Sequence, residues 1–523
     1  MMSSTYRWLR LAPLAFGSVV LLSGCFTAAQ DCTRTLTCDV GDSGAGGAGG
    51  AGGASDAGPQ CIDDPAMASA VDDCGIFVSS SRGDDKSAGT REAPVKTIAV
   101  ALQLAAYAKQ RVYACAELFQ EAVEMPSGFT LFGGLDCAHG WAYIGSSKQT
   151  KIKPLERAIA LTLLKGEQGK SLVTDVHAEG PNASDPGASS IGALAREGAN
   201  ATLRRCTLVA NHGAAGKPGE PGDDHNMPGD AGTSGKAGAD ACTADMVSGG
   251  AQLKTSCGGL TSIGAQGGNG GPTSGTTGAD GQPSPAPNPQ GYGLGGDGEV
   301  PGLTCMVGEA GADGVNGKEA LGAHGPGHLT QSGYVADAAA DGEDGLPGQG
   351  GGGGGGRKAG ALFCGMGPKG GAAGGSGGSG GCGGKGGKGG GAGGSSIALV
   401  NLSHGLTLFD CQLTAGDAGD GGPGGVSQIG GAPGIAGEGG MGKNGSGFCC
   451  AGAQGGKGGN GGNGGGGLGG SSIAFAYTAS DITLTGFVLV VGKKGKGGYG
   501  GNPNLMGSTG EDGIAQPIAA LLP

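Results

Sequence analysis

Four charged residues stand where a repeated segment of the chain changes its pattern: Asp175, Arg204, Arg205 and Asp410. A carboxylate beside a basic side chain can act as general acid and general base on a bound substrate. Charged residues at a bend that faces water would look the same in the sequence, so catalysis at these positions is only a hypothesis. No Gly-x-Ser-x-Gly nucleophile motif follows a predicted strand, and we assign no catalytic residue.

The candidate metal ligands are few. His324 and His328 are four residues apart but lie in a Gly-Pro loop rather than on a helix, which disfavours a metal site. Asp417 and Asp420, surrounded by glycine, could hold a weakly bound calcium ion, although acidic loop residues usually face water. We therefore predict no metal and no other cofactor.

The segment that must position the charged residues is itself repeated. Ser189–Ala210 has copies of 21 or 22 residues at Ser395–Ala415, at Ser471–Val491 and, more weakly, at Ala160–Gly180. Self-similarity at this length indicates stacked units that bury a shared core. Apolar residues lie two apart within each copy, which is typical of strands, and the alternation changes phase at Arg204–Arg205. Strand, bend and strand predict one coil of a parallel β-helix.

The alignment of the copies predicts which residues stack. Leu408–Leu413 should lie beside Leu203–Leu208, although a long insert separates them in the sequence. Cys206, Cys411 and Phe487 should occupy equivalent positions that point into the core.

The composition limits the size of that core. The chain has 523 residues, of which 128 are glycine, and only 4% are aromatic. Its formal net charge is −12, with no strongly basic segment. Nucleic-acid binding through release of counterions is therefore disfavoured.

The N-terminus predicts export. Arg7 and Arg10 precede a short apolar run, and the run ends in Leu22-Ser23-Gly24-Cys25, which resembles the bacterial lipobox. The resemblance implies a signal peptide over 1–25 and lipidation of Cys25. Phe26 follows the cysteine in place of the aspartate that signals retention in the inner membrane, so an outer-membrane anchor is favoured. Residues 26–60, with the run GAGGAGGAGGA, are predicted to be a flexible tether.

Residues 61–210 are predicted to form the first part of the folded domain. The stretch GIFVSSSRGDDKSAGTREAPVKTIAVALQLA, followed by RVYACAELFQEAVEMPSGFTLFGGLDC, resembles the N-terminal module of bacterial right-handed parallel β-helix proteins of the pectin-lyase-like class. The resemblance implies that a helix at Pro94–Ala108 caps the core. It also places Cys115 and Cys137 on adjacent strands, where we predict a disulfide.

Cys61 and Cys74 are further disulfide candidates, and Cys32 and Cys38 could close a small loop in the tether. The chain has 16 cysteines, so lipidation of one would leave an odd number and at least one free thiol.

Glycine-rich blocks interrupt the coils. They are predicted at 211–394, 416–470 and 492–523, with coils at 395–415 and 471–491, and each block leaves after an equivalent strand. Glycine recurs every third residue, for example from Gly371 to Gly389 and from Gly452 to Gly470. A collagen-like helix, disorder and a bundle of polyglycine II helices all fit this period. The blocks resemble the glycine-rich repeats called PGRS, and seven cysteines within them favour order.

The sequence thus predicts an all-β fold, a right-handed parallel β-helix with an N-terminal capping helix and long glycine-rich inserts that are polyglycine II-like or disordered. Two functions follow as hypotheses. The first is a non-enzymatic surface lipoprotein that displays the inserts for adhesion, matrix contact or envelope structure. The second is a tethered polysaccharide lyase, hydrolase or carbohydrate-binding protein, which rests on fold analogy alone. A groove along the coils with converging carboxylates and a basic residue would favour the second.

Overall fold

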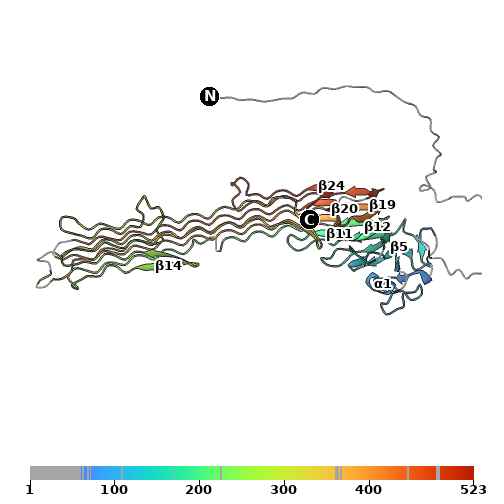
Figure 1. Cartoon of the computed structure of the whole chain (residues 1–523), viewed down its shortest axis with the longest axis horizontal. Helices are drawn as coiled ribbons and strands as arrows, with labels where there is room; N and C mark the ends of the chain where they lie inside the picture. Colours follow the sequence, from blue (N-terminus) through green and yellow to red (C-terminus); the bar gives the residue numbers. More distant parts are fainter. Residues whose placement is uncertain are drawn as a thin grey trace, which may run out of the picture. The chain divides into compact units, whose positions relative to one another are not determined.

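The computed structural model describes residues 61–522, except 62–63, 68–69, 71, 108–109, 168, 224–225, 360–363, 366–367, 444–446 and 479–482. These residues belong to one compact unit, Pro59–Pro523. The unit is nearly all β (Figure 1). The described part contains one α-helix, α1 (Ile98–Ala105), and one 3-10 helix, η1 (Asp72–Cys74).

Three parallel sheets form the coiled part of the unit. Sheet A contains β1 (Ile76–Val78), β2 (Arg111–Cys115), β5 (Thr130–Asp136), β9 (Ser171–Thr174), β12 (Asn200–Arg204), β19 (Gly405–Phe409) and β22 (Thr483–Thr485), with β6 (Ala142–Tyr143) antiparallel to β5. Sheet B contains β3 (Leu118–Phe119), β7 (Thr150–Ile152), β10 (Val176–Glu179), β13 (Thr207–Ala210), β20 (Gln412–Ala415) and β23 (Val488–Val490). Sheet C contains β4 (Val123–Pro126), β8 (Leu161–Leu164), β11 (Ser190–Ala195), β18 (Ser396–Asn401), β21 (Ser472–Tyr477) and β24 (Ala515–Ala520).

The chain passes through the sheets in the repeating order B, C, A, from β3, β4 and β5 to β20, β21 and β22. Leu408 pairs with Leu203 on one side and with Leu484 on the other, and Leu413 pairs with Leu208. The predicted stacking of Leu408–Leu413 beside Leu203–Leu208 is therefore confirmed.

The sequence predicted two strands per coil, but each full coil has three. The additional strand is the one in sheet C, and all six residues of β18 are buried. One side of sheet C faces the main core, while Ile191, Ile397 and Ile473 on the other side pack against Leu329 of an insert. A strand covered on both faces shows no alternation of apolar and polar residues, which is why the pattern did not reveal it.

The core runs through the middle of the coils and is covered at its first end by α1. The helix is shorter than the predicted Pro94–Ala108. Val95 instead bridges to β1, and Thr97 is the N-cap, whose hydroxyl accepts from the Val100 N–H at 3.3 Å. The Glu121 carboxylate accepts from the next two N–H groups, at Ile98 and Ala99.

The last coil is exposed. Cys206 and Cys411 are 1% and 2% exposed, as expected for inward positions, whereas Phe487 is 40% exposed. Phe487 follows the same register, since Val488 pairs with Gln412. It was wrongly predicted to be buried, because no further coil covers it within the described residues.

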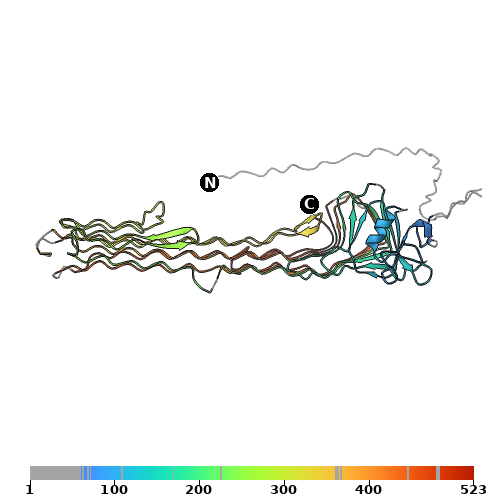
Figure 2. The same ribbon diagram turned by 90° about the horizontal axis from the view of Figure 1, so that it is seen from below.

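All three glycine-rich blocks leave sheet B and re-enter sheet C, after β13, β20 and β23. We call their segments, over 213–394, 416–470 and 492–514, the glycine bundle; they run side by side away from the coils (Figures 1 and 2). The first block also contains two hairpins, β14 (Leu253–Cys257) with β15 (Leu260–Gly264) and β16 (His328–Thr330) with β17 (Gly333–Val335). The last block was predicted to be a glycine-rich tail, but it ends in β24, which pairs with β21.

Hydrogen bonds between extended segments hold the glycine bundle together. In the segment 371–394, the N–H groups of Gly377, Gly378 and Ser379 donate to three different neighbouring segments, at Ala265, Ala453 and Thr233, over 2.9, 2.9 and 3.0 Å. The pattern repeats every third residue, since Gly381 and Gly384 donate to Gly456 and Gly459. Two further segments donate back to 371–394 through Gly351 and Gly434. A segment with five such neighbours is not part of a collagen triple helix.

A segment with close neighbours on more sides needs more glycines in each three-residue repeat. A Cβ on any residue of Gly351–Gly356 would lie 1.9–2.2 Å from a carbonyl oxygen of a neighbour, so all six must be glycine. Along 213–238 only every third residue meets such a neighbour, and Lys217 and Pro218 between two of these glycines are exposed. This segment lies at the edge of the bundle.

Disulfides join segments that are distant in sequence. Cys242–Cys364, Cys257–Cys382 and Cys305–Cys450 lie in the glycine bundle, and Cys61–Cys74 and Cys115–Cys137 lie by the coils. Among the described cysteines Cys206, Cys411 and Cys449 are free, and all three are buried.

Candidate functional site

The predicted catalytic candidates lie at the bend between sheets A and B. Asp175, Arg205, Asp410 and Gly486 are aligned on successive coils and have φ values of 55°, 51°, 50° and 63°, in the left-handed region. Aspartate and glycine adopt this conformation more readily than most residues, which explains their presence at the bend. The position is thus selected first by backbone geometry.

The structure brings three of the four candidates together. The Arg205 guanidinium donates to both oxygens of Asp175, at 3.0 and 2.7 Å, and to both oxygens of Asp64, at 3.1 Å. Arg204 also reaches Asp64, at 3.2 Å. Tyr143 donates its hydroxyl to Asp175 at 2.9 Å.

This bend cluster of Asp64, Tyr143, Asp175, Arg204 and Arg205 has little capacity for acid–base chemistry. Asp175 is 1% exposed, and both carboxylates are bonded to guanidinium groups. Burial raises the pKa of Asp64, but the hydrogen bonds from Arg205 outweigh it and the pKa lies below its ordinary value. The contact with Asp175 raises the pKa of Arg205. Asp410 lies one coil further along, is exposed, and makes none of the contacts described for the cluster.

A polar cleft on the outer face of sheet B was missed by the sequence reasoning. Its volume is about 650 Å³, and its charged or imidazole lining residues are Glu117, Lys148, Lys151 and His177. The signal was present, because Lys151 in β7 and His177 and Glu179 in β10 occupy the outward positions of their strands.

The carboxylates of this cleft region are already bonded. Glu117 accepts from the hydroxyls of Ser79, Ser80 and Ser81 at 3.1, 2.9 and 2.6 Å. Burial raises the pKa of Glu179, but hydrogen bonds from Lys151, Lys153 and Asn211 lower it to about 2. Burial and the charge of Lys151 lower the pKa of His177, which favours its neutral imidazole. The cleft therefore offers an imidazole and lysines, which suit binding of a polar ligand.

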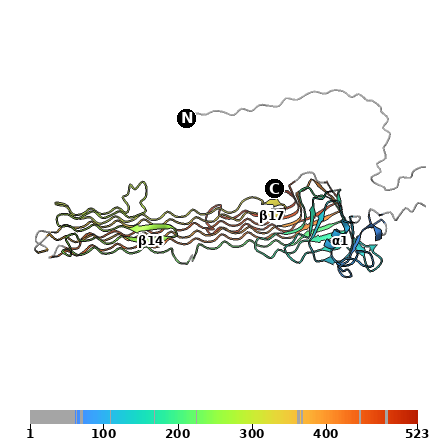
Figure 3. The same ribbon diagram turned by 60° about the horizontal axis from the view of Figure 1, so that its bottom comes forward.

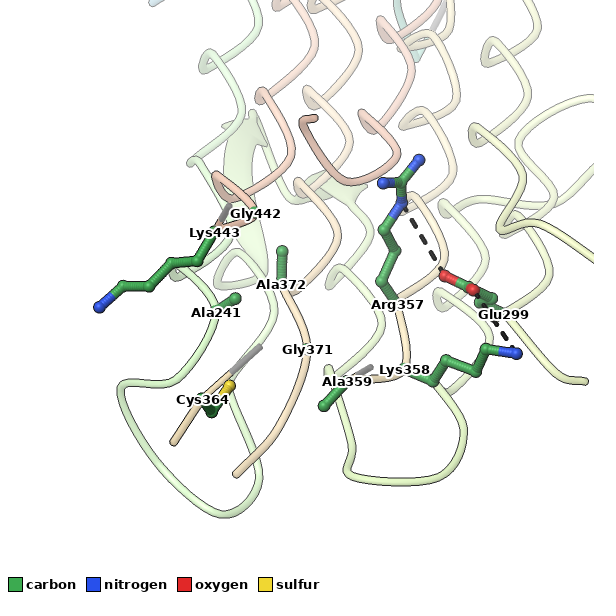
Figure 4. Close-up of a pocket in the computed structure, with 10 residues that line it drawn as sticks. All are labelled: Ala241, Glu299, Arg357, Lys358, Ala359, Cys364, Gly371, Ala372, Gly442 and Lys443. Atoms are coloured by element: carbon green, nitrogen blue, oxygen red, sulfur yellow. Dashed lines mark ion pairs between the residues drawn. The ribbon is translucent and has the colours of Figure 1, made fainter. Parts of the chain in front are cut away.

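A smaller pocket of about 120 Å³ lies in the glycine bundle, near the Cys242–Cys364 disulfide (Figure 4). Arg357 and Lys358 flank Glu299 on one side, with nitrogen–oxygen distances of 3.9 Å, and the Lys443 side chain extends away from them (Figure 4). Its basic residues Arg357 and Lys358 are engaged by Glu299, and we assign no ligand to the pocket.

Acidic and amide side chains cap the edges of the glycine bundle. Asp417 and Asp420 accept from the N–H groups of Lys493 and Lys496 at 2.8 and 2.7 Å, in positions where an adjacent backbone would otherwise accept. Asp417 and Asp420, the two residues suggested as calcium ligands, therefore have a structural role in the bundle. His324 lies beside Glu511 at 3.4 Å, apart from His328 in β16.

The other predicted sites have different outcomes. Cys25, Cys32 and Cys38 lie outside the described residues. Cys115 and Glu117 lie with Cys137 in the spacing of a metal site, but the two sulfurs form a disulfide. No described helix is both long and apolar enough to span a bilayer.

Comparisons with protein-family models, with curated proteins and with solved structures gave no significant match to this chain.

Proposed function

We propose that the protein is an exported, lipid-anchored surface scaffold built on a right-handed parallel β-helix, and that its glycine bundle is a shaft of polyglycine II helices that makes contact with other surfaces. Cys25 would carry the lipid anchor at the outer membrane. The contacts would serve adhesion, matrix contact or envelope structure rather than bond cleavage.

The observation that carries this proposal is the common origin of the inserts. Blocks that are far apart in the sequence leave sheet B at the same corner, and they hydrogen-bond to one another every third residue. For example, the N–H of Gly437 donates to Ser376, and the N–H of Gly452 donates to Gly437. Three disulfides brace the same bundle. A bundle ordered in this way costs conformational entropy that a mere spacer would not need to lose.

The surface of the bundle suits weak, repeated contact. Where segments are exposed, side chains recur every third residue, about 9 Å apart at the rise of an extended threefold helix. Lys385 and Lys388, for example, pair with Asp344 and Asp341 at 2.8 and 3.0 Å. Many weak contacts at a regular spacing add up to strong attachment through multivalency.

A variant without the bundle tests the proposal. The short loop Gly180–Ser189, which joins β10 to β11, supplies a natural connection between sheets B and C. In the variant, one copy of this loop would replace each of the segments 211–395, 416–471 and 491–514. We expect this variant to keep the β signal of the coils in circular dichroism and to lose binding to cells, matrix and a glycan array. Unchanged binding by the variant would refute the proposal.

The membrane anchor needs a separate test. We expect Cys25→Ser to release the protein from the membrane or to block its processing, as measured by fractionation. Mass spectrometry of the mature N-terminus would contradict the anchor if it found an unacylated residue elsewhere.

The polar cleft on sheet B favours a second candidate function, carbohydrate binding by the coils. Lys151 and His177 line a cleft of about 650 Å³, which is large enough for a sugar unit. Binding that survives removal of the bundle but is lost in Lys151→Ala with His177→Ala would support this function. Cleavage of a polysaccharide that stops in Asp410→Ala would indicate an enzyme instead.

A further inference from the structure

An apolar row runs along one edge of the glycine bundle. In the segment 416–441, every third residue is exposed, and the row includes Val426, Ile429, Ile435 and Met441, which are 40%, 51%, 66% and 53% exposed. The segment has no charged residue between Asp420 and Glu438. On the segment 452–470 the corresponding exposed positions carry charged or amide side chains, such as Lys457 and Asn460. Exposed apolar groups gathered in this way mark an interaction surface.

The backbone of this row is also open. Among the described residues, the N–H groups of Val426, Ile429 and Ile435 have no protein acceptor. Only the end of the row is capped, where Asp240 accepts from Met441 at 2.7 Å.

Another exposed row of the bundle is treated differently. Asp313, Asn316 and Glu319 cap the N–H groups of Lys457, Asn460 and Asn463 at 2.7, 2.8 and 3.1 Å. The chain therefore uses side chains to close one row of donors and leaves the apolar row open.

The neighbouring segment, 213–241, offers the complementary groups. Every third residue of this segment donates to the apolar-row segment, as Gly219 and Gly232 do to Pro423 and Ala432 at 2.8 Å. The positions just before Gly219 and Gly222 are Pro218 and Pro221, which lack an N–H group. Their carbonyl oxygens accept from no protein group within the described part of the chain. One segment thus has open donors, and the segment beside it has open acceptors.

We propose that this edge, made of the two segments 213–241 and 416–441, is a self-association surface and that its occupant is a second copy of this chain. A two-fold axis across the edge would place the open donors of each copy opposite the open acceptors of the other. Such an isologous contact needs a surface that is complementary to itself.

The size of the edge agrees with a second copy. Each chain carries a net charge of −12, so two copies repel over most faces; the stretch Gly421–Gly437 adds no charge to the edge, and on the segment 213–241 Lys217 and Lys236 stand among carboxylates such as Glu220 and Asp230. The segment 416–441 is about 78 Å long at about 3.1 Å per residue. Two segments at a spacing of about 4.8 Å are about 10 Å wide, so the edge offers about 750 Å² per partner, close to the about 800 Å² that a stable dimer buries.

The test uses a double variant, Ile429→Lys/Ile435→Lys, and a matched double variant on another segment as control. The control is Val315→Lys/Leu321→Lys, because these side chains are also apolar and are 67% and 56% exposed. Sedimentation and light scattering on the unit from Pro59 onward should show a dimer at micromolar concentration. We expect the first variant to weaken it at least about 100-fold, as loss of two central contacts would. The control should dimerise as the parent does.

Amide hydrogen exchange gives a second measurement that does not depend on the variants. The N–H groups of Val426, Ile429 and Ile435 should become protected as the protein concentration rises, while that of Val315 should not. A parent that stays monomeric at about 100 µM would overturn the proposal. So would an Ile429→Lys/Ile435→Lys variant that dimerises normally, a control variant that dissociates, or capture of a different protein by the edge of a monomer.

Discussion

A Cβ atom on Gly377 would lie 1.9 Å from the carbonyl oxygen of Gly351, in a segment that joins the bundle from a different part of the sequence. The contact is between two backbones, so no side chain can move aside to relieve it. Glycine is required here by the closeness of a neighbour. Figure 3 shows how densely such segments lie beside one another.

The first prediction follows from this contact. We expect Gly377→Ala to destabilise the glycine bundle by about 1–3 kcal/mol, because it overpacks a site that cannot relax. Hydrogen exchange of the bundle amides is the measurement. Ser234→Ala, on an exposed position of the edge segment, is the control and should change little.

The second prediction concerns the bend cluster. We expect Arg205→Gly to cost about 3 kcal/mol of stability in denaturant unfolding, since it leaves Asp175, which is 1% exposed, without its guanidinium partner. Glycine keeps the left-handed backbone at this position, so the loss isolates the ion pair. Asp410→Gly, at the equivalent exposed position of the next coil, should be nearly neutral. Equal effects of the two changes would show that the bend, not the pair, is what matters.

The third prediction concerns acid stability. The pKa of Glu179 is about 2 in the fold, below its ordinary value of 4.5. A lowered carboxyl pKa contributes stability that is present above pH 4.5 and is lost as the pH falls from 4.5 to 2. We expect Glu179→Gln to remove on the order of 2 kcal/mol of this pH-dependent stability, after allowance for the half-exposed lysines around it. Parallel unfolding curves for parent and variant across this range would contradict it.

The fourth prediction concerns the disulfide Cys257–Cys382, which joins β14 to the segment 371–394. Cys257 and Cys382 are 125 residues apart, so the bridge restricts a long loop in the unfolded chain. We expect the double change to serine to cost about 2–4 kcal/mol and to expose the hairpin to proteolysis. The coils should unfold as before, because their core contains neither residue.

Much of the coiled part could be read from the sequence because its strands alternate. Leu203, Leu408 and Leu484 stand at the same place in copies of one segment, and they pair in the structure. The strand β18 could not be read in this way, since both of its faces are buried. The exposure of Phe487 depends on which coil is last, and a repeat pattern does not contain that information.

The three-residue period of the glycine blocks and their departure from equivalent points of the coils are already visible in the sequence. It left open whether those blocks were ordered, because collagen, disorder and lateral packing share the same period. The packing of the segments resolves this choice, because it brings Gly351–Gly356 close enough to 371–394 and other segments for each of its six N–H groups to find a carbonyl on a neighbour. The tertiary structure also decided that Asp175, Arg205 and Asp64 form an ion-pair cluster, since residues more than a hundred positions apart meet only when the coils stack.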